Sequence, residues 1–164
     1  MMKENIYLGG PISGYDLDER RRLFGKIENC LSRNGYEVFN PLKNGLPEDA
    51  LKRDHMRADI RNLTECDAIA FLPGWEYSAG CMTEFNVAAC LKLKVFLVYD
   101  KASSVVLWRF DVHALPDCNP IDFANGLEVQ LEDGYRAGAY ARMTIRNSFA
   151  LYERLSIELK YEDE

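Results

Sequence analysis

Short apolar runs alternate with longer amphipathic segments along the first hundred residues of this chain. Four apolar runs have the length and composition of buried strands: residues 6–8, 36–39, 67–72 and 95–99. Three segments carry apolar side chains at helical spacing: residues 16–34, 54–66 and 79–93. This alternation predicts an α/β three-layer sandwich. We expect a flavodoxin- or Rossmann-like parallel sheet with strand order 2-1-3-4-5.

Local signals mark the start of two of these helices. Asp16 is followed three residues later by Glu19, which resembles a capping box. Ser78 stands just before the third helical segment, and serine is a favoured N-cap residue. The helices are therefore predicted to begin at these two positions.

The pattern is weaker after residue 100. Residues 105–110 are interpreted as a short helix, and residues 127–131 alternate as an exposed fifth strand would. Residues 133–161 are predicted to form a C-terminal helix, which covers the sheet or makes a dimer contact. The sequence leaves these two roles open.

Length and charge limit the class of protein. The 164 residues suit one domain over 1–164, with a core at 5–99 and an extension at 100–164. The net charge of −6 argues against a nucleic-acid polymer or a membrane surface as partner. No apolar run reaches the roughly 18 residues of a membrane span, and the first residues show no signal-peptide pattern. We expect a cytoplasmic protein.

Neither cysteine nor histidine spacing indicates a metal centre. The five cysteines are scattered and fit small buried apolar positions. His55 and His113 have no cysteine or acid at metal-type spacing. We therefore expect no metal and no cofactor.

A glycine-rich loop follows the first apolar run, with the sequence Gly9-Gly10-Pro11-Ile12-Ser13-Gly14. Glycines let backbone N–H groups approach a ligand closely, and Ser13 adds a polar donor. The pattern is not G-x-G-x-x-G, so it does not support a dinucleotide site. An ordinary strand-to-helix turn is the alternative.

A second loop follows the third apolar run and carries Trp75, Tyr77, Ser78 and Gly80. In the predicted sheet the loops after strands one and three meet at one edge. Ser78 and the glycine amides can bind a phosphate at the helix N-terminus, although Ser78 is equally an N-cap. The aromatic rings can stack on a base, or form a hydrophobic lid or an oligomer contact.

Three further side chains can face the same edge. Glu84, early in the third helix, can act as a nucleophile on an anomeric carbon if the positive helix end favours its ionised form. Asp59, beside the apolar stripe of the second helix, can keep a raised pKa and protonate a leaving base. Tyr7 can orient Glu84. Taken singly, Glu84 and Asp59 are also ordinary helix acids.

Together these residues resemble the nucleoside 2-deoxyribosyltransferase-like superfamily, which includes 2′-deoxynucleoside 5′-phosphate N-hydrolases. The resemblance covers roughly residues 5–99 and rests on the glycine-rich loop, on Asp59, and on Ser78 with Glu84 six positions later. The segment from Pro73 to Ser78 also resembles a poorly characterised bacterial and phage branch. The resemblance implies that Glu84 is the nucleophile, that Asp59 assists the base and that Tyr7 positions the nucleophile.

Ser78 separates two activities within that superfamily. The transferases carry an aspartate at this position, and the phosphate-specific hydrolases carry serine. A neutral hydroxyl accepts a 5′-phosphate that a carboxylate repels. We therefore expect an N-glycosidase acting on a (deoxy)nucleoside 5′-monophosphate, in a chain that forms a homodimer. A base-exchanging transferase on nucleosides and a non-catalytic nucleotide-binding module are the alternatives.

Overall fold

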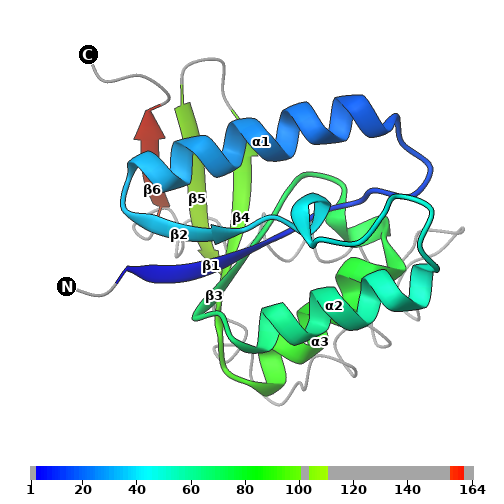
Figure 1. Cartoon of the computed structure of the whole chain (residues 1–164). Coiled ribbons are helices and arrows are strands. Elements are labelled where there is room, and N and C mark those ends of the chain that lie inside the picture. Colours follow the sequence, from blue (N-terminus) through cyan, green and yellow to red (C-terminus); the bar gives the residue numbers. More distant parts are fainter. Residues whose placement is uncertain (1–2, 101–103, 111–155, 161–164) are drawn as a thin grey trace, which may run out of the picture.

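A single sheet of six strands runs through the residues that the computed structural model describes, 3–100, 104–110 and 156–160 (Figure 1). The strand order is β2-β1-β3-β4-β5-β6. The strands are β1 (Glu4–Gly9), β2 (Tyr36–Phe39), β3 (Ala68–Phe71), β4 (Lys94–Asp100), β5 (Ser104–Phe110) and β6 (Ser156–Lys160). The first four are parallel to one another, whereas β5 and β6 join as antiparallel strands.

Helices cover both faces of the sheet. Helix α1 (Leu17–Arg33) lies on one face, and α2 (Lys52–Thr64) and α3 (Ala79–Cys90) lie together on the other (Figure 1). Two short 3₁₀-helices, η1 (Pro41–Lys43) and η2 (Trp75–Tyr77), follow β2 and β3. The predicted α/β sandwich with strand order 2-1-3-4-5 is confirmed.

The two predicted helix caps are present. The side chain of Asp16 accepts a hydrogen bond of 2.9 Å from the backbone N–H of Glu19. The hydroxyl of Ser78 accepts one of 3.3 Å from the N–H of Cys81. Each bond satisfies a backbone donor that has no partner inside its helix.

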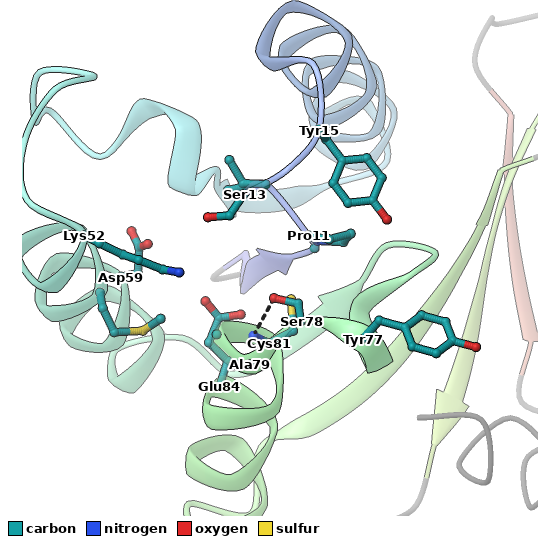
Figure 2. Close-up of a pocket in the computed structure, with 14 residues that line it drawn as sticks. Pro11, Ser13, Tyr15, Lys52, Asp59, Tyr77, Ser78, Ala79, Cys81 and Glu84 are labelled. Carbon is teal, nitrogen blue, oxygen red and sulfur yellow. Dashed lines mark hydrogen bonds between the residues drawn. The ribbon is translucent and has the colours of Figure 1, made fainter. Parts of the chain in front are cut away.

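The loops after β1 and β3 pack directly on one another at the carboxyl edge of the sheet. The N–H of Leu72 donates to the carbonyl of Gly9 at 2.7 Å. A Cβ at Gly74 would lie 3.3 Å from the Pro11 ring and would need a strained backbone, because φ there is 88°. The two loops, far apart in sequence, form one edge, and a cavity opens there (Figure 2).

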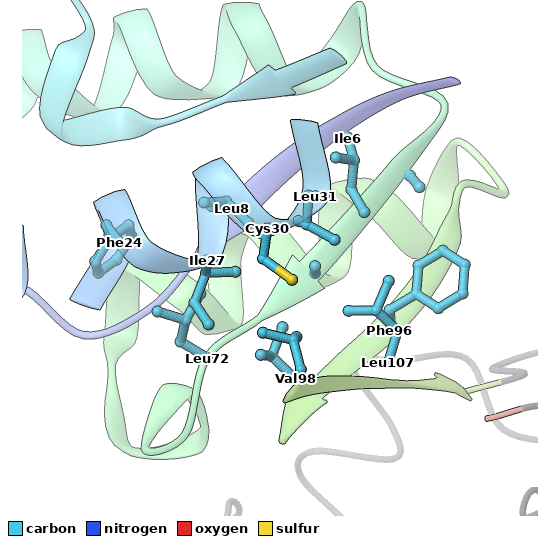
Figure 3. Close-up of a cluster of buried hydrophobic side chains, with 13 residues drawn as sticks. Ile6, Leu8, Phe24, Ile27, Cys30, Leu31, Leu72, Phe96, Val98 and Leu107 are labelled. Atoms are coloured by element: carbon cyan, nitrogen blue, oxygen red, sulfur yellow. The ribbon is translucent and has the colours of Figure 1, made fainter. Parts of the chain in front are cut away.

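Strand alternation decides which side chains face which helix. Ile6 and Leu8 of β1 pack under α1, among the buried side chains shown in Figure 3. Tyr7, between them, points to the opposite face and joins the core beneath α2 and α3. Because side chains alternate along a strand, a tyrosine hydroxyl enters the α2–α3 side while its neighbours complete the α1 side.

The expectations beyond residue 100 need correction. Residues 105–110 were expected to be helical, but they lie in β5, and their β-branched and aromatic residues favour a strand. Only three residues separate β4 from β5, too few for a parallel crossover, so β5 pairs antiparallel. Residues 156–160, part of the predicted C-terminal helix, form β6. The strand predicted at 127–131 and the rest of that helix lie outside the described residues.

Among the described residues, no helix combines the length and the apolar character that crossing a membrane requires.

Candidate functional site

A cavity of about 250 Å³ opens at the carboxyl edge of β1 and β3 (Figure 2). Three segments line it: the loop after β1, one side of α2, and η2 with the start of α3. The lining residues are Gly10, Pro11, Ile12, Ser13, Tyr15, Lys52, Met56, Asp59, Tyr77, Ser78, Ala79, Gly80, Cys81 and Glu84. Its position is the usual one for ligands in open α/β sheets.

Tyr7 and Glu84 form a buried pair at the floor of this cavity. The Tyr7 hydroxyl donates a hydrogen bond of 2.8 Å to Oε1 of Glu84. Tyr7 is fully buried, and its ring stacks on Phe39 with centroids 5.4 Å apart. The strand and the ring contact hold the hydroxyl in place, so it fixes the orientation of the carboxyl group.

The second oxygen of Glu84 has no hydrogen-bond partner among the described residues. Oε2 is buried, and Glu84 as a whole is 6% exposed. A buried polar atom without a partner costs free energy, and such atoms often mark functional positions. In Figure 2, Glu84 stands between Asp59 on one side and Ser78 on the other. The Glu84 carboxyl group therefore lies at the cavity wall between Asp59 and Ser78.

Burial controls the protonation of Glu84. It raises the pKa of Glu84 to about 8, although the Tyr7 hydrogen bond lowers it, and the nearby Asp59 carboxylate adds to the rise. Burial therefore opposes the ionised form of Glu84 that the positive end of the helix was expected to favour. Glu84 lies in the second turn of α3, where the dipole effect has faded and desolvation is larger.

Asp59 enters the cavity from α2 and is 9% exposed. Burial raises its pKa, while a hydrogen bond from Asn44 and the nearby His55 lower it. The raised pKa expected for Asp59 is thus present. Ionised Asp59 thus adds to the rise in the pKa of Glu84, so the two carboxyl groups of the cavity influence one another through their charges.

Ser78 has both of the roles that the sequence left open. It caps α3 and also lines the cavity, together with Gly80, Gly10 and Ser13. The N-terminus of α3 therefore opens into the cavity, where backbone N–H groups and the helix dipole favour an anion.

Three residues proposed for binding do not line the cavity. Trp75 is 6% exposed and stacks on Phe71 and Phe85, with centroids 4.6 and 5.6 Å away. It is a core residue beneath the site, so the expectation that it contacts a ligand is not met. Gly9 lies under the cavity, where a Cβ would meet the Phe71 ring at 2.8 Å and Glu84 Oε2 at 3.1 Å. Gly14 has a φ of 86° and shapes the turn before α1.

A protein-family model describes residues 4–97 as a domain of unknown function, DUF4406. The chain belongs to the DUF4406 family. The matched region contains every residue that lines the cavity, and it ends within β4. The site is thus a feature of the DUF4406 domain.

Comparison with curated proteins gave no match. Two solved structures are partly similar to this DUF4406 chain. A conserved protein from Enterococcus faecalis V583 is 24% identical, with a TM-score of 0.48 over 62% of this chain and 66% of that one. The CMP N-glycosidase BcmB from Clostridium botulinum is 20% identical, with a TM-score of 0.41 over 57% and 67%.

The structure adds lining residues that the sequence did not single out. Lys52 is the one cationic side chain among the cavity-lining residues, and Tyr15 and Met56 complete the wall. Asn44, from the loop after η1, holds Asp59. The turn signal Asn44-Gly45 was visible in the sequence, but its contact depends on how the loop folds over α2.

No group of three or more histidine, cysteine, aspartate or glutamate side chains suited to a metal ion occurs in the ranges that the structure describes. Cys81 lines the cavity, and burial raises the pKa of its thiol to about 12, so it is not a thiolate at neutral pH.

Proposed function

We propose that this DUF4406 chain is an N-glycosidase that cleaves the base–sugar bond of a (deoxy)nucleoside 5′-monophosphate. The observation that carries the proposal is the Glu84 carboxyl group. Tyr7 fixes one of its oxygens, the other is buried with no hydrogen-bond partner among the described residues, and Glu84 lines the same cavity as Asp59 and Ser78. A carboxylate that is oriented but not satisfied is what a nucleophile at an anomeric carbon requires.

In the proposed reaction, Oε2 of Glu84 bonds to C1′ as the C1′–N bond breaks. The bonding electron pair leaves with the base, which takes a proton from Asp59. Water then attacks C1′ of the glycosyl ester, gives its proton to the Asp59 carboxylate, and releases free sugar phosphate and Glu84. The two carboxyl groups thus take the two roles usual in retaining glycosidases.

The proton of this pair must lie on Asp59 when substrate is bound. In the unliganded protein the higher pKa, about 8, belongs to Glu84. A sugar that develops positive charge at C1′ stabilises ionised Glu84 and shifts the proton towards Asp59. Only the singly protonated pair is competent, so activity falls when the pair holds two protons or none.

The phosphate is assigned to the mouth of α3. Ser78 and Ser13 are neutral donors, Gly80 and Gly10 leave room for the backbone, and the helix N-terminus favours an anion. BcmB is named for a reaction of the same class on CMP.

The test is incubation with a panel of nucleoside 5′-monophosphates and nucleosides, followed by chromatography for free base. Glu84→Gln should abolish release while substrate still binds, and Glu37→Gln, an exposed acid on β2, should change nothing. Mass spectrometry of acid-quenched native protein should detect a sugar phosphate on the peptide that contains Glu84.

Three outcomes distinguish a hydrolase, a transferase and a nucleotide-binding module. Base release without an added acceptor supports the hydrolase. Release that requires a second base supports a transferase instead. Binding with no cleavage by the native protein would overturn the enzyme proposal in favour of a nucleotide-binding module.

A further inference from the structure

The amide of Asn44 connects a loop to two side chains of α2. Nδ2 of Asn44 donates a hydrogen bond of 3.1 Å to Oδ1 of Asp59 and lies 3.0 Å from Nδ1 of His55. Oδ1 of Asn44 accepts one of 3.1 Å from the backbone N–H of Leu46. Because a backbone N–H can only donate, the Leu46 bond fixes which end of the amide is oxygen. Both hydrogens of Nδ2 therefore point at α2.

A local turn sets this orientation. Asn44 ends η1, and the next residue, Gly45, has a φ of 84°, which favours glycine over any other residue. The bond from Leu46 closes an Asx-type turn over Gly45. The turn thereby restricts the Asn44 side chain and holds its amide against α2.

His55 is the second side chain of α2 that contacts the Asn44 amide. An amide nitrogen can only donate, so Nδ1 of His55 is the acceptor in this contact. Both donor hydrogens of Asn44 are then used, one for each partner. The amide has no alternative rotamer that keeps all three of its bonds.

Asp59 is left with one fixed oxygen and one available oxygen. Oδ1 accepts from Asn44, and Oδ2 has no hydrogen-bond partner in the part of the chain that the structure describes. Asp59 lines the same cavity as Glu84. We propose that Asn44 is a positioning residue that holds Asp59 so that Oδ2 delivers the proton to the leaving base. This inference rests on the proposed function, because it concerns the proton step assigned to Asp59.

The same bond stabilises the product of the proton transfer. As Oδ2 gives up its proton, negative charge develops on the Asp59 carboxylate, and the Asn44 N–H strengthens its bond to that charge. Charged or titratable groups from three elements also lie near Asp59. Glu84 comes from α3, Tyr7 from β1, His55 from α2 itself, and Lys52 lines the cavity nearby. Asn44, which carries no charge, adds a neutral donor that is hydrogen-bonded to Asp59.

The test compares Asn44→Ala with Asn62→Ala. Asn62 is a half-buried asparagine on α2 whose Nδ2 donates to the carbonyl of Ala58 at 2.8 Å, so its loss removes a similar bond away from Asp59. Asn44→Ser serves as a second variant, because its hydroxyl can still close the turn but is too short to hold α2. Asn44→Ser allows the same test if Asn44→Ala fails to fold.

The first measurement is the pKa of Asp59 in each protein, determined by ¹³C NMR of its carboxyl carbon. We expect Asn44→Ala and Asn44→Ser to raise it by about half a unit or more, because a bond to the ionised form is lost. Asn62→Ala should leave it unchanged. An unmoved pKa in both Asn44 variants, or an equal shift in Asn62→Ala, would overturn the proposal. This readout needs no catalysis, so it remains decisive even if the native protein cleaves no nucleotide.

The second measurement uses the monophosphate that the native protein cleaves best. We expect kcat of the Asn44 variants to fall about tenfold or more with KM changed less than about threefold, because the lost interaction acts mainly in the transition state. In the profile of kcat against pH, which reports the substrate complex, the alkaline limb should move to higher pH together with the pKa of Asp59. A loss confined to KM would assign Asn44 to binding and overturn the positioning role.

Discussion

The hydroxyl of Tyr7 and Oε1 of Glu84 are 2.8 Å apart although 77 positions separate the two residues in the chain. Tyr7 lies on β1, at the centre of the parallel part of the sheet, and Glu84 lies in the second turn of α3. Both side chains are buried, and Glu84 also lines the cavity. Substitution of either residue tests the proposed chemistry through this contact.

Tyr7→Phe should reduce kcat for the cleaved nucleotide about ten- to a hundredfold while KM changes little. The substitution keeps the ring that stacks on Phe39 and removes only the donor to Glu84. That bond lowers the pKa of Glu84, so its loss should also move the acid-side limb of the kcat profile to higher pH. Steady-state kinetics across pH checks both effects. An unchanged kcat would show that Tyr7 does not orient a nucleophile.

Glu84→Gln should gain stability relative to the native protein as pH rises. The folded protein raises the pKa of Glu84 from 4.5 to about 8, so its proton is held more tightly in the folded state. That contribution is fully present below pH 4.5 and is lost as pH rises to about 8. The neutral glutamine is free of this loss, and each unit of pKa shift corresponds to about 1.4 kcal/mol.

Urea unfolding of both proteins at pH 5, 7 and 9 measures this difference. The free energy of unfolding of Glu84→Gln minus that of the native protein should increase by up to a few kcal/mol between the first and last pH. A difference that stays constant with pH would contradict the buried, proton-binding state of Glu84.

Ser78→Asp should separate nucleotides from nucleosides. Aspartate also caps helices well, so α3 should keep its N-terminus. Its carboxylate repels a 5′-phosphate, and we expect affinity for the monophosphate to fall about tenfold or more while nucleoside affinity is retained. Isothermal titration calorimetry with matched nucleoside and monophosphate pairs checks this. Equal losses for both ligands would place the phosphate elsewhere.

Gly9→Ala should destabilise the fold by about 1–3 kcal/mol, because the new Cβ would lie 2.8 Å from the Phe71 ring, which packs against Trp75. Gly25→Ala is the matched control. Gly25 lies inside α1 with open space around it, so the change should stabilise by about 0.5–1 kcal/mol. Urea unfolding of the two variants should give shifts of opposite sign. A neutral Gly9→Ala would mean that the Phe71 ring can move aside.

The sequence alone predicted the first four strands and three helices because each carries a local signal. Apolar runs separated by amphipathic segments indicate a parallel sheet, and the caps at Asp16 and Ser78 depend on bonds to residues three positions away. The strand order was expected because alternating strands and helices commonly adopt the flavodoxin-like arrangement. Beyond residue 100 the same reasoning failed for residues 105–110, since a short apolar run has no period that separates a strand from a helix.

For the candidate site, too, the sequence determined one part and the tertiary structure the other. Sequence determined which residue types were available, and it named Tyr7, Asp59, Ser78 and Glu84 before their positions were known. Only the tertiary structure decided that Tyr7 contacts Glu84, that Trp75 packs in the core and that Asn44 holds Asp59. It also decided that Glu84 has the higher proton affinity, because burial is created by packing between α3 and the sheet, and no local pattern in the chain records how much water that packing removes.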